Sequence, residues 1–507
     1  MLNKIRDIKT KIFKGNSVWL LFICLFVFTS RLYFSTRIDL GRDDLGFFVV
    51  AQDVADGGIP YVTSWDHKGP LLYFILAPVI VLFGNSIFAL RIFTTFYILV
   101  SIISVYFIAK RLFEGKTCLI PPLIYGLFFT SGNFNTKMSS AEILMMLPAI
   151  IAILCFINYM QNKKYPYMSL ILCGFFSAAG IFIKATALFT VSICPVILIL
   201  KKIRIRQYTW NVFLKELFCY TFGGLIISVF FVSYYAFHNS LPEFYHGFYE
   251  FNSKYVNFRS AGEGIRKLLK FLYRIIRKRN DFVTVLALVS LTLISLKKGY
   301  TSKQKNIAYF VIGLTLLSLL GVYWPKYMWD MYFIQMGLAF SLLIAFAISL
   351  LNINITGFNL KKSHAVIGIL LSIVTIVDVA GFSNNYKHKN QEEKILYKIS
   401  DYIATNTKKD ETIFVLGGSN SIYFLSKRKA PTKYFHWPFH HGKKGEILQI
   451  KDATLKILSE NKPKYFAYLK ASRKVEYLEK FMLDNYHVEK RFNDYILYKV
   501  KEENRAE

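Results

Sequence analysis

The sequence is poor in cysteine and in acidic residues for its length. It has six cysteines among 507 residues, and all six lie in or beside apolar runs, without the spacing of metal ligands. Cysteines in such places behave as small apolar residues, so we expect neither a disulfide framework nor a zinc site. Acidic residues number 32 against 63 basic ones, which gives a formal net charge of +31. The basic residues are spread through short loops and form no compact module, which argues against binding to nucleic acid.

Long apolar runs fill most of the chain. Hydrophobic residues make up 54% of it and aromatic residues 17%, a composition that is rare in a soluble protein of this size. Repeated apolar runs of about 18–22 residues predict a polytopic α-helical membrane protein. The first run, near residues 17–34, is long for the apolar part of a secretion signal, and no small-residue cleavage site follows it. We therefore expect a retained first helix.

The charges between the runs predict the topology. The head of the chain, residues 4–14, is basic, which places the N-terminus in the cytoplasm. The run 71–83 is too short to cross a bilayer and suits a re-entrant or interfacial helix. If this run does not span, the basic loops fall inside, except for the basic stretch around Arg266 and Arg274, and about 11 spans result, within a range of 11–13. The spans are expected near 17–34, 87–109, 117–130, 143–160, before 184, before 201, 212–237, 281–296, before 324, 328–351 and 365–382.

From about Asn384 the chain becomes polar, and no later run is long enough to span a membrane. Strand-like runs at 412–418, 464–469 and 495–498 alternate with helical stretches at 392–405, 446–459 and 474–485. The sequence therefore predicts a transmembrane domain, residues 1–383 with a first outer loop at 37–86, followed by an extracytoplasmic α/β domain at 384–507.

Charged and polar residues that could carry chemistry converge on the outer face in this topology. They are Asp43, Asp44, His67, Lys68, Glu142, Lys184, His246, Glu250, Lys254, Arg266 and Arg274. Simpler roles stay open, since acids favour helix N-termini and lysines extend from apolar surfaces toward water. The basic stretch around Arg266 and Arg274 could be an amphipathic helix that binds lipid phosphates or pyrophosphate on the outer leaflet.

A carboxylate pair near lysines suits transfer of a group from a phosphate-linked donor. Asp43 or Asp44 could deprotonate an acceptor hydroxyl or amine. Lysines could neutralise the phosphate leaving group, on which negative charge grows in the transition state. Either carboxylate could instead bind a divalent metal, which is the one cofactor that the residues suggest.

Several short motifs match those of a known family. They are Asp43-Asp44 with Phe47-Phe48, the turn Gly57-Gly58-Ile59-Pro60-Tyr61, the element Asp66-His67-Lys68-Gly69-Pro70-Leu71, Phe83-Gly84 with Ala89-Leu90-Arg91, and the separate residues Glu142 and Lys184. On these residues the first 190 or so positions resemble the C-superfamily integral-membrane glycosyltransferases. The bacterial branch related to protein O-mannosyltransferases and to the lipid A aminoarabinose transferase is the most similar. Gly69 stands where that family usually has proline, and Met331-Tyr332-Phe333 where it often has His-Tyr-Phe.

The resemblance implies a polyprenyl-phosphate-linked sugar donor, an extracytoplasmic active site and an acceptor in the cell envelope, which would be a glycan, lipid or protein. It implies Asp43 as the base, with Lys68 and Lys184 near the donor phosphate. The expected protein is thus a multi-pass enzyme of the bacterial cytoplasmic membrane. A flippase-like transport component is one alternative, but it would carry its charges along a path within the spans. A polysaccharide polymerase or ligase is another, and it would rely on arginines in large outer loops.

Overall fold

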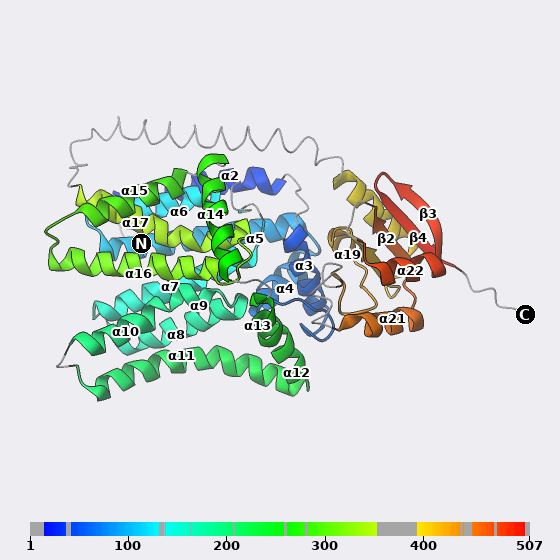
Figure 1. Cartoon of the computed structure of the whole chain (residues 1–507), viewed down its shortest axis with the longest axis horizontal. Coiled ribbons are helices and arrows are strands. Elements are labelled where there is room, and N and C mark those ends of the chain that lie inside the picture. The colour runs from blue at the N-terminus through cyan, green and yellow to red at the C-terminus, as the bar shows by residue number, and fades with distance from the viewer. Residues whose placement is uncertain are drawn as a thin grey trace, which may run out of the picture. The chain divides into compact units, whose positions relative to one another are not determined.

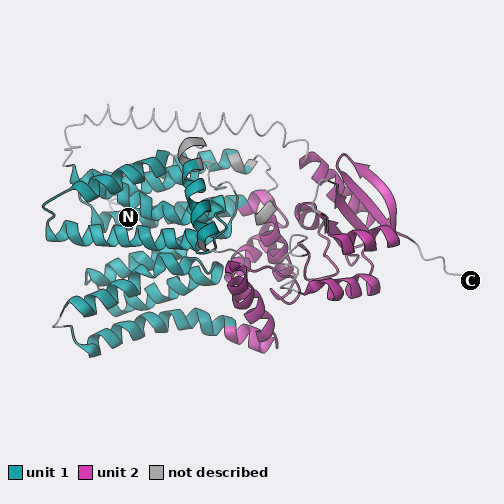
Figure 2. Cartoon of the chain, in the orientation of Figure 1, with its two compact units in different colours: residues 1–36, 91–231, 259–382 teal, residues 37–90, 232–258, 383–507 magenta. Residues whose placement is uncertain are grey.

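The computed structural model describes residues 15–36, 42–130, 136, 138–162, 164–205, 208–257, 261–278, 282–351, 393–436, 440, 449–470 and 474–501. The chain forms two compact units, each assembled from three separate segments (Figure 2). We call residues 1–36, 91–231 and 259–382 the helical unit. We call residues 37–90, 232–258 and 383–507 the mixed unit.

The helical unit is built from helices, most of which are long and apolar (Figure 1). They are α2 (Asn16–Thr36), α5 (Ile87–Leu112), η1 (Gly115–Leu119), α6 (Ile120–Thr130), α7 (Ala141–Met160), α8 (Pro166–Ile183), α9 (Ala187–Val191), α10 (Ile193–Arg204), α11 (Trp210–Phe237), α14 (Ala261–Lys278), α15 (Phe282–Leu296), α16 (Ser302–Tyr323), η3 (Asp330–Gln335) and α17 (Met336–Leu350). The first residues of α5 and the last of α11 belong to the mixed unit.

Seven helices of the described residues are long and apolar enough to cross a membrane: α2, α5, α7, α8, α11, α16, and η3 continued by α17. Every predicted span within the described residues coincides with helix. Three of these spans coincide with helices that are shorter than predicted. Helix α6 starts only after the turn η1, Ser192 separates α9 from α10, and α15 has 15 residues. The predicted span 365–382 lies outside the described residues. The chain is a multi-pass membrane protein, as predicted.

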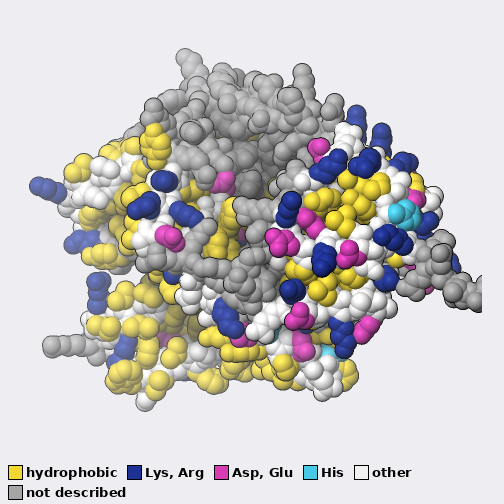
Figure 3. Space-filling model, turned by 45° about the vertical axis from the view of Figure 1, so that its right-hand side comes forward, with side chains coloured by type: hydrophobic (Ala, Val, Ile, Leu, Met, Phe, Trp, Pro, Cys, Tyr) yellow, Lys and Arg dark blue, Asp and Glu magenta, His cyan; other side chains and the backbone are white. Residues whose placement is uncertain are grey.

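Two glycine positions let α8 and α11 cross in direct backbone contact. A Cβ atom on Gly174 would lie 1.8 Å from the carbonyl oxygen of Tyr220, and one on Gly223 would lie 1.9 Å from that of Ile171. Small residues at a crossing allow this approach in membrane helices, where packing takes the place of the hydrophobic effect. Elsewhere α11 leaves apolar side chains exposed, among them Val229 and Phe230. Figure 3 shows hydrophobic side chains in patches on one face, with charged side chains among them.

The mixed unit contains a four-stranded sheet. Its strands are β1 (Ile413–Leu416), β2 (Tyr465–Leu469), β3 (Tyr486–Phe492) and β4 (Tyr495–Val500), in the order β1-β2-β4-β3. β1 and β2 pair in parallel, and the other two pairs are antiparallel. A helix at 393–406, α19 (Ser421–Ser426), α21 (Ile450–Glu460) and α22 (Glu476–Asn485) accompany the sheet.

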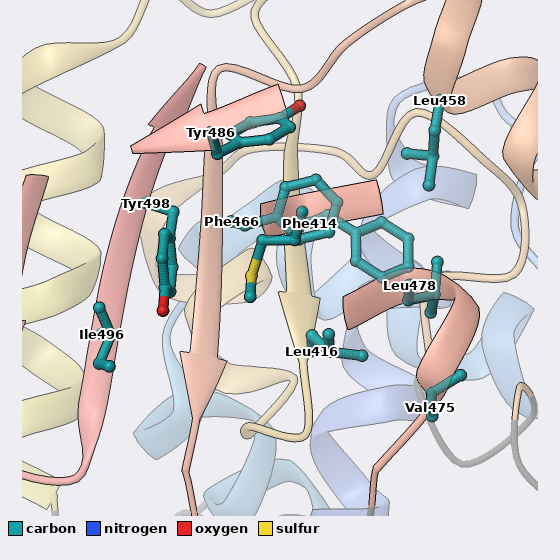
Figure 4. Close-up of a cluster of buried hydrophobic side chains, with 10 residues drawn as sticks. Phe414, Leu416, Leu458, Phe466, Val475, Leu478, Tyr486, Ile496 and Tyr498 are labelled. Carbon is teal, nitrogen blue, oxygen red and sulfur yellow. The ribbon is translucent and has the colours of Figure 1, made fainter. Parts of the chain in front are cut away.

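The core of this sheet is apolar and aromatic. Phe414, Phe466, Leu478 and Tyr486 are buried in it together, as Figure 4 shows. The strands predicted around 412–418, 464–469 and 495–498 are confirmed. The sequence prediction missed β3, because most of its side chains are polar and partly exposed at the edge of the sheet. Edge strands with charged side chains are common, since the charges discourage pairing with other chains.

Residues 37–90 and 232–258 supply the rest of the mixed unit. Residues 37–90 form α3 (Arg42–Ala55) and α4 (Leu71–Phe83). Residues 232–258 form α12 (Leu241–Phe244), the π-helical turn η2 (Tyr245–Glu250) and α13 (Phe251–Val256). α4 coincides with the short apolar run predicted not to span. Helix α19 packs on α3, where the rings of Phe48 and Phe424 lie 5.7 Å apart. The first loop and the C-terminal sheet therefore form one compact unit.

Candidate active site

The loop between α3 and α4 is shaped by two adjacent glycines. Gly57 has a φ of +89°, a conformation that glycine adopts without strain. A Cβ atom on Gly58 would lie 2.4 Å from the Asp53 carboxylate, so a larger residue does not fit there. The hydroxyl of Thr63 donates a hydrogen bond to the same carboxylate. This turn leads the chain from α3 into the segment that carries Asp66.

Three consecutive side chains after this turn form a row. Nδ1 of His67 lies 3.0 Å from Oδ1 of Asp66, and Nε2 of His67 lies 2.7 Å from Nζ of Lys68. The ammonium of Lys68 is always a donor, so Nε2 accepts from it, and the ring proton of a neutral His67 then sits on Nδ1, toward Asp66. The ammonium also lies 5.6 Å from the centre of the Phe47 ring. We call these three residues the Asp-His-Lys row.

Asp66 is held in its charged form. Burial by itself would raise the pKa of the Asp66 carboxyl, which is 6% exposed. The hydrogen bond with His67 and the charge of Lys68 outweigh burial, and His436 adds to them, so the pKa of Asp66 lies well below its usual range. The negative end of the row therefore persists across the physiological pH range.

Residues from two other places fix the backbone of the row. The hydroxyl of Tyr61 donates to the carbonyl of Lys68 at 2.5 Å, and Nδ2 of Asn252 donates to the carbonyl of His67 at 2.8 Å. The ring of Phe251 lies 5.4 Å from that of His67, centre to centre. Gly247 makes room for Tyr61, because a Cβ atom there would lie 2.4 Å from the tyrosine ring.

The C-terminal part of the mixed unit also touches this loop. The backbone N–H of Trp65 donates to the carbonyl of Lys433 at 2.9 Å, and the rings of Trp65 and Tyr434 lie 5.7 Å apart. His436 is close enough to lower the pKa of Asp66 and is itself held by Asn420 at 2.7 Å. Segment 420–436 is therefore part of the surroundings of the row.

The predicted catalytic pair lies in the first turn of α3. The side chain of Asp44 is buried, at 1% exposure. A carboxylate in the first turn is stabilised by the helix dipole. The side chain of Asp43 lies outside the described residues, so its role as the base stays a prediction. Among the described residues, no group of three or more His, Cys, Asp or Glu side chains is placed to hold a metal ion.

In the helical unit, the predicted residues Glu142 and Lys184 form a buried ion pair. Glu142 lies in the first turn of α7, which Ser140 caps by accepting a hydrogen bond from the N–H of Ile143. Lys184 follows the last residue of α8, and its ammonium lies 4.1 Å from the centre of the Tyr332 ring. The structure thus brings these two residues together and gives the lysine a carboxylate partner.

The predicted residues after α11 form a chain of charges. Glu250 accepts from His246 and from Lys254, each at 2.6 Å. These hydrogen bonds, with Lys254 contributing most, lower the pKa of Glu250. All three side chains are partly exposed, which fits a solvated helix face, and their predicted contact with a substrate stays a prediction. The prediction missed the inward residues of this segment, Asn252 and Phe251, although they stand in the same aromatic run of the sequence.

The remaining predicted residues belong to α14. Arg266 is exposed on it, and the side chain of Arg274 lies outside the described residues. Ile265, Leu269 and Tyr273 are exposed four residues apart along the helix, beside Arg266 and Lys270. A basic helix with an exposed apolar stripe is typical of a membrane interface, as the sequence suggested.

Comparison with known families follows this geometry. Residues 67–235 match the sequence model of the dolichyl-phosphate-mannose-protein mannosyltransferase family. Residues 390–501 match that of the Ccs4 C-terminal domain, which is named after a competence-induced protein. No curated protein sequence matches the chain.

Among solved structures, the chain is similar to ArnT from Cupriavidus metallidurans bound to undecaprenyl phosphate. The TM-score is 0.64 and the sequence identity 12%, over 96% of this chain and 98% of that one. The chain has the fold of the C-superfamily membrane glycosyltransferases. It is also similar to arabinofuranosyltransferase AftD from Mycobacteria, with a TM-score of 0.52 and 12% identity over 96% of this chain and 42% of that one.

The solved structures show that the chain shares the C-superfamily fold, and the family model matches residues 67–235 of it. That segment opens at His67, inside the Asp-His-Lys row, and includes both members of the buried pair Glu142–Lys184. Sequence analysis did not select Tyr61 and Asn252, whose side chains donate hydrogen bonds to the backbone carbonyls of Lys68 and His67. Only Tyr61 had a local signal, the Gly-Gly-x-Pro-Tyr turn.

Proposed function

We propose that this chain is a membrane glycosyltransferase, and that it moves one sugar from a polyprenyl-phosphate-linked donor to an acceptor of the cell envelope. The acceptor would be a glycan, a lipid or a protein. The reaction takes place at the outer face of the bacterial cytoplasmic membrane, with the N-terminus inside and the C-terminus outside. The observation that carries the proposal is the Asp-His-Lys row, clamped by Tyr61 and Asn252 at the start of the family match. That ArnT was solved with undecaprenyl phosphate supports the choice of donor.

In this proposal Lys68 binds the donor phosphate. An ammonium has three N–H donors, and His67 occupies one of them at 2.7 Å. The other two are available to phosphate oxygens. As the sugar–phosphate bond breaks, negative charge grows on those oxygens, and a fixed ammonium stabilises it. Asp66 keeps the proton of His67 on Nδ1, so that Nε2 stays an acceptor and holds the ammonium in place.

The acceptor hydroxyl needs a base, and Asp43 or Asp44 fills that role in the proposal. The carboxylate takes the hydroxyl proton while the oxygen attacks the anomeric carbon, and the phosphate leaves on the polyprenyl chain. A divalent metal at the two aspartates is an added proposal. Membrane lipids are further partners, bound along the basic side of α14 near Arg266.

The test uses the purified full-length chain and a polyprenyl-phosphate hexose, with release of polyprenyl phosphate as the readout. Lys68→Ala should lower the rate by about 100-fold or more, as expected for loss of one fixed charge at a developing anion. Lys68→Arg should recover part of it, since a planar guanidinium meets His67 differently. Lys456→Ala on α21, exposed and far along the chain, is the control. Transport of intact donor without release of polyprenyl phosphate would favour the flippase-like alternative and overturn the proposal.

A further inference from the structure

A second feature of the mixed unit is a pocket that none of the three residues of the Asp-His-Lys row lines. The pocket, of about 320 Å³, opens between α3 and the segment 423–435. This volume is at the lower end of the range of about 300–1,000 Å³ for small-ligand sites. The aromatic residues Tyr423 and Phe435 form part of its wall. The proposed reaction gives these groups no role.

Two residues that line this pocket each carry a buried polar atom without a hydrogen-bond partner among the described residues. They are Oγ of Ser64, in a side chain that is 5% exposed, and Oε1 of Gln52. Leaving such atoms unbonded costs free energy, and in folded proteins nearly all of them are satisfied by protein, water or ligand. Both residues line the open pocket, where hydroxyl groups of a ligand are the partners that the described residues do not supply.

The charges at the pocket are unequal. Lys429 is engaged, since its ammonium lies 2.9 Å from Oδ1 of Asp53 and 3.6 Å from Oδ2 of Asp56. Lys409 and Lys427 also line the pocket, are exposed, and make no ion pair with the described residues. Two cations are therefore available to a ligand, whereas both carboxylates already face a cation. This balance favours an anion.

We propose that this pocket binds an anionic unit of the acceptor: a sugar carrying a carboxylate or phosphate group. The inference rests on the proposed function, since it assigns the acceptor class. Hydroxyl groups of the sugar meet Ser64 and Gln52, its apolar face meets the aromatic wall, and its anionic group meets Lys409 and Lys427. Aromatic lining with a few placed polar groups is the usual design of small-ligand sites.

The test measures binding without any donor, on the purified full-length chain. Trigalacturonate is the anionic probe, maltotriose is the neutral probe of equal length, and inorganic phosphate is the probe without a sugar. Calorimetry should show binding of trigalacturonate, weakened by added salt, and much weaker binding of the other two. Lys409→Gln combined with Lys427→Gln should weaken trigalacturonate binding about tenfold or more, as expected for lost hydrogen bonds to a charged group.

Two variants act as checks. Lys451→Gln combined with Lys456→Gln makes the same charge change on α21, outside the pocket, and should leave the affinity unchanged. Ser64→Ala should weaken binding while leaving the thermal midpoint unchanged or higher, because it removes a buried hydroxyl that lacks a partner. A merely structural Ser64 would lower the midpoint instead.

The inference is overturned if maltotriose or phosphate binds as tightly as trigalacturonate, or if the two double variants bind alike. Failure of the proposed function gives a different result: trigalacturonate binds as expected, but no polyprenyl phosphate is released. If the chain transfers sugar but does not bind trigalacturonate, the inference about the pocket is refuted and the proposed function stands.

Discussion

The ammonium of Lys184 lies against the carboxylate of Glu142, 42 residues earlier in the chain, and over the ring of Tyr332. Both charged side chains are almost fully buried, at 9% and 1% exposure. A buried pair of this kind is costly to break, because the remaining charge loses its partner without regaining water. The pair also supplies an explanation of Lys184 that does not involve a substrate.

A pair of variants separates the two roles of Lys184. Glu142→Gln should destabilise the protein in detergent by about 3–5 kcal/mol, the usual cost of an uncompensated buried charge. Glu142→Gln combined with Lys184→Met removes both charges and should recover most of the thermal midpoint. If Lys184 also serves the donor, this stable double variant will show a raised KM for the polyprenyl-phosphate sugar. A normal KM would mean that the pair only holds α7 and α8.

The close approach of Gly247 to Tyr61 can be tested by a substitution that adds one methyl group. Gly247→Ala should displace the Tyr61 ring and with it the hydrogen bond to the Lys68 carbonyl, so activity should fall by about tenfold or more. Gly262→Ala is the matched control, since a Cβ atom on Gly262 in α14 meets no atom within 4 Å. That control should be neutral or slightly stabilising. Equal activity of both variants would show that Tyr61 does not position the row.

His440 predicts a pH dependence of the C-terminal sheet. Burial lowers the pKa of His440 to about 4, despite the hydrogen bond to the Tyr434 carbonyl. A lowered pKa means that the unfolded chain binds the proton more tightly, so stability is full above about pH 6.5 and falls as the pH drops toward 4. Protection factors of the β1 and β2 amides, which correct for the intrinsic exchange rate at each pH, should therefore fall over this range.

Two histidine variants check this assignment. His440→Phe should remove the pH dependence of exchange at β1 and β2, because phenylalanine carries no titratable proton. His487→Gln, on the edge strand β3, should leave it unchanged. An unchanged pH profile in His440→Phe would assign the effect to other groups.

The topology gives a further prediction. A reporter that is active only outside the cytoplasm should be active when fused after Lys398, and silent when fused after Lys298 in the basic loop following α15. The reverse pattern would mean that the run of α4 crosses the membrane. It would also place the row and the C-terminal sheet on opposite sides, which contradicts the contact of Trp65 with Lys433.

Local patterns explain what the sequence could predict. The helices follow from apolar runs, and the Gly57-Gly58 turn and the Asp66–Lys68 element follow from residues adjacent in the chain. The pairing of Glu142 with Lys184 depends on how α7 and α8 pack, and a single sequence carries no signal of that contact. The same holds for Asn252, whose amide reaches His67 across 185 residues of chain. Candidate residues could therefore be named from the sequence, but their partners could not.

The mixed unit sets an order on the maturation of the protein. Asp53 in α3 meets Lys429, 376 residues later. Bringing together ends so distant in the chain is slow, because most of the polypeptide must be made and placed before the contact can form. A nascent chain still attached to the ribosome before residue 420 has its first helices but not the neighbours of Asp66 and Trp65 that segment 420–436 supplies. The surroundings of the Asp-His-Lys row are thus completed only after segment 420–436 has been made, and under the proposed function shorter chains would lack a finished site.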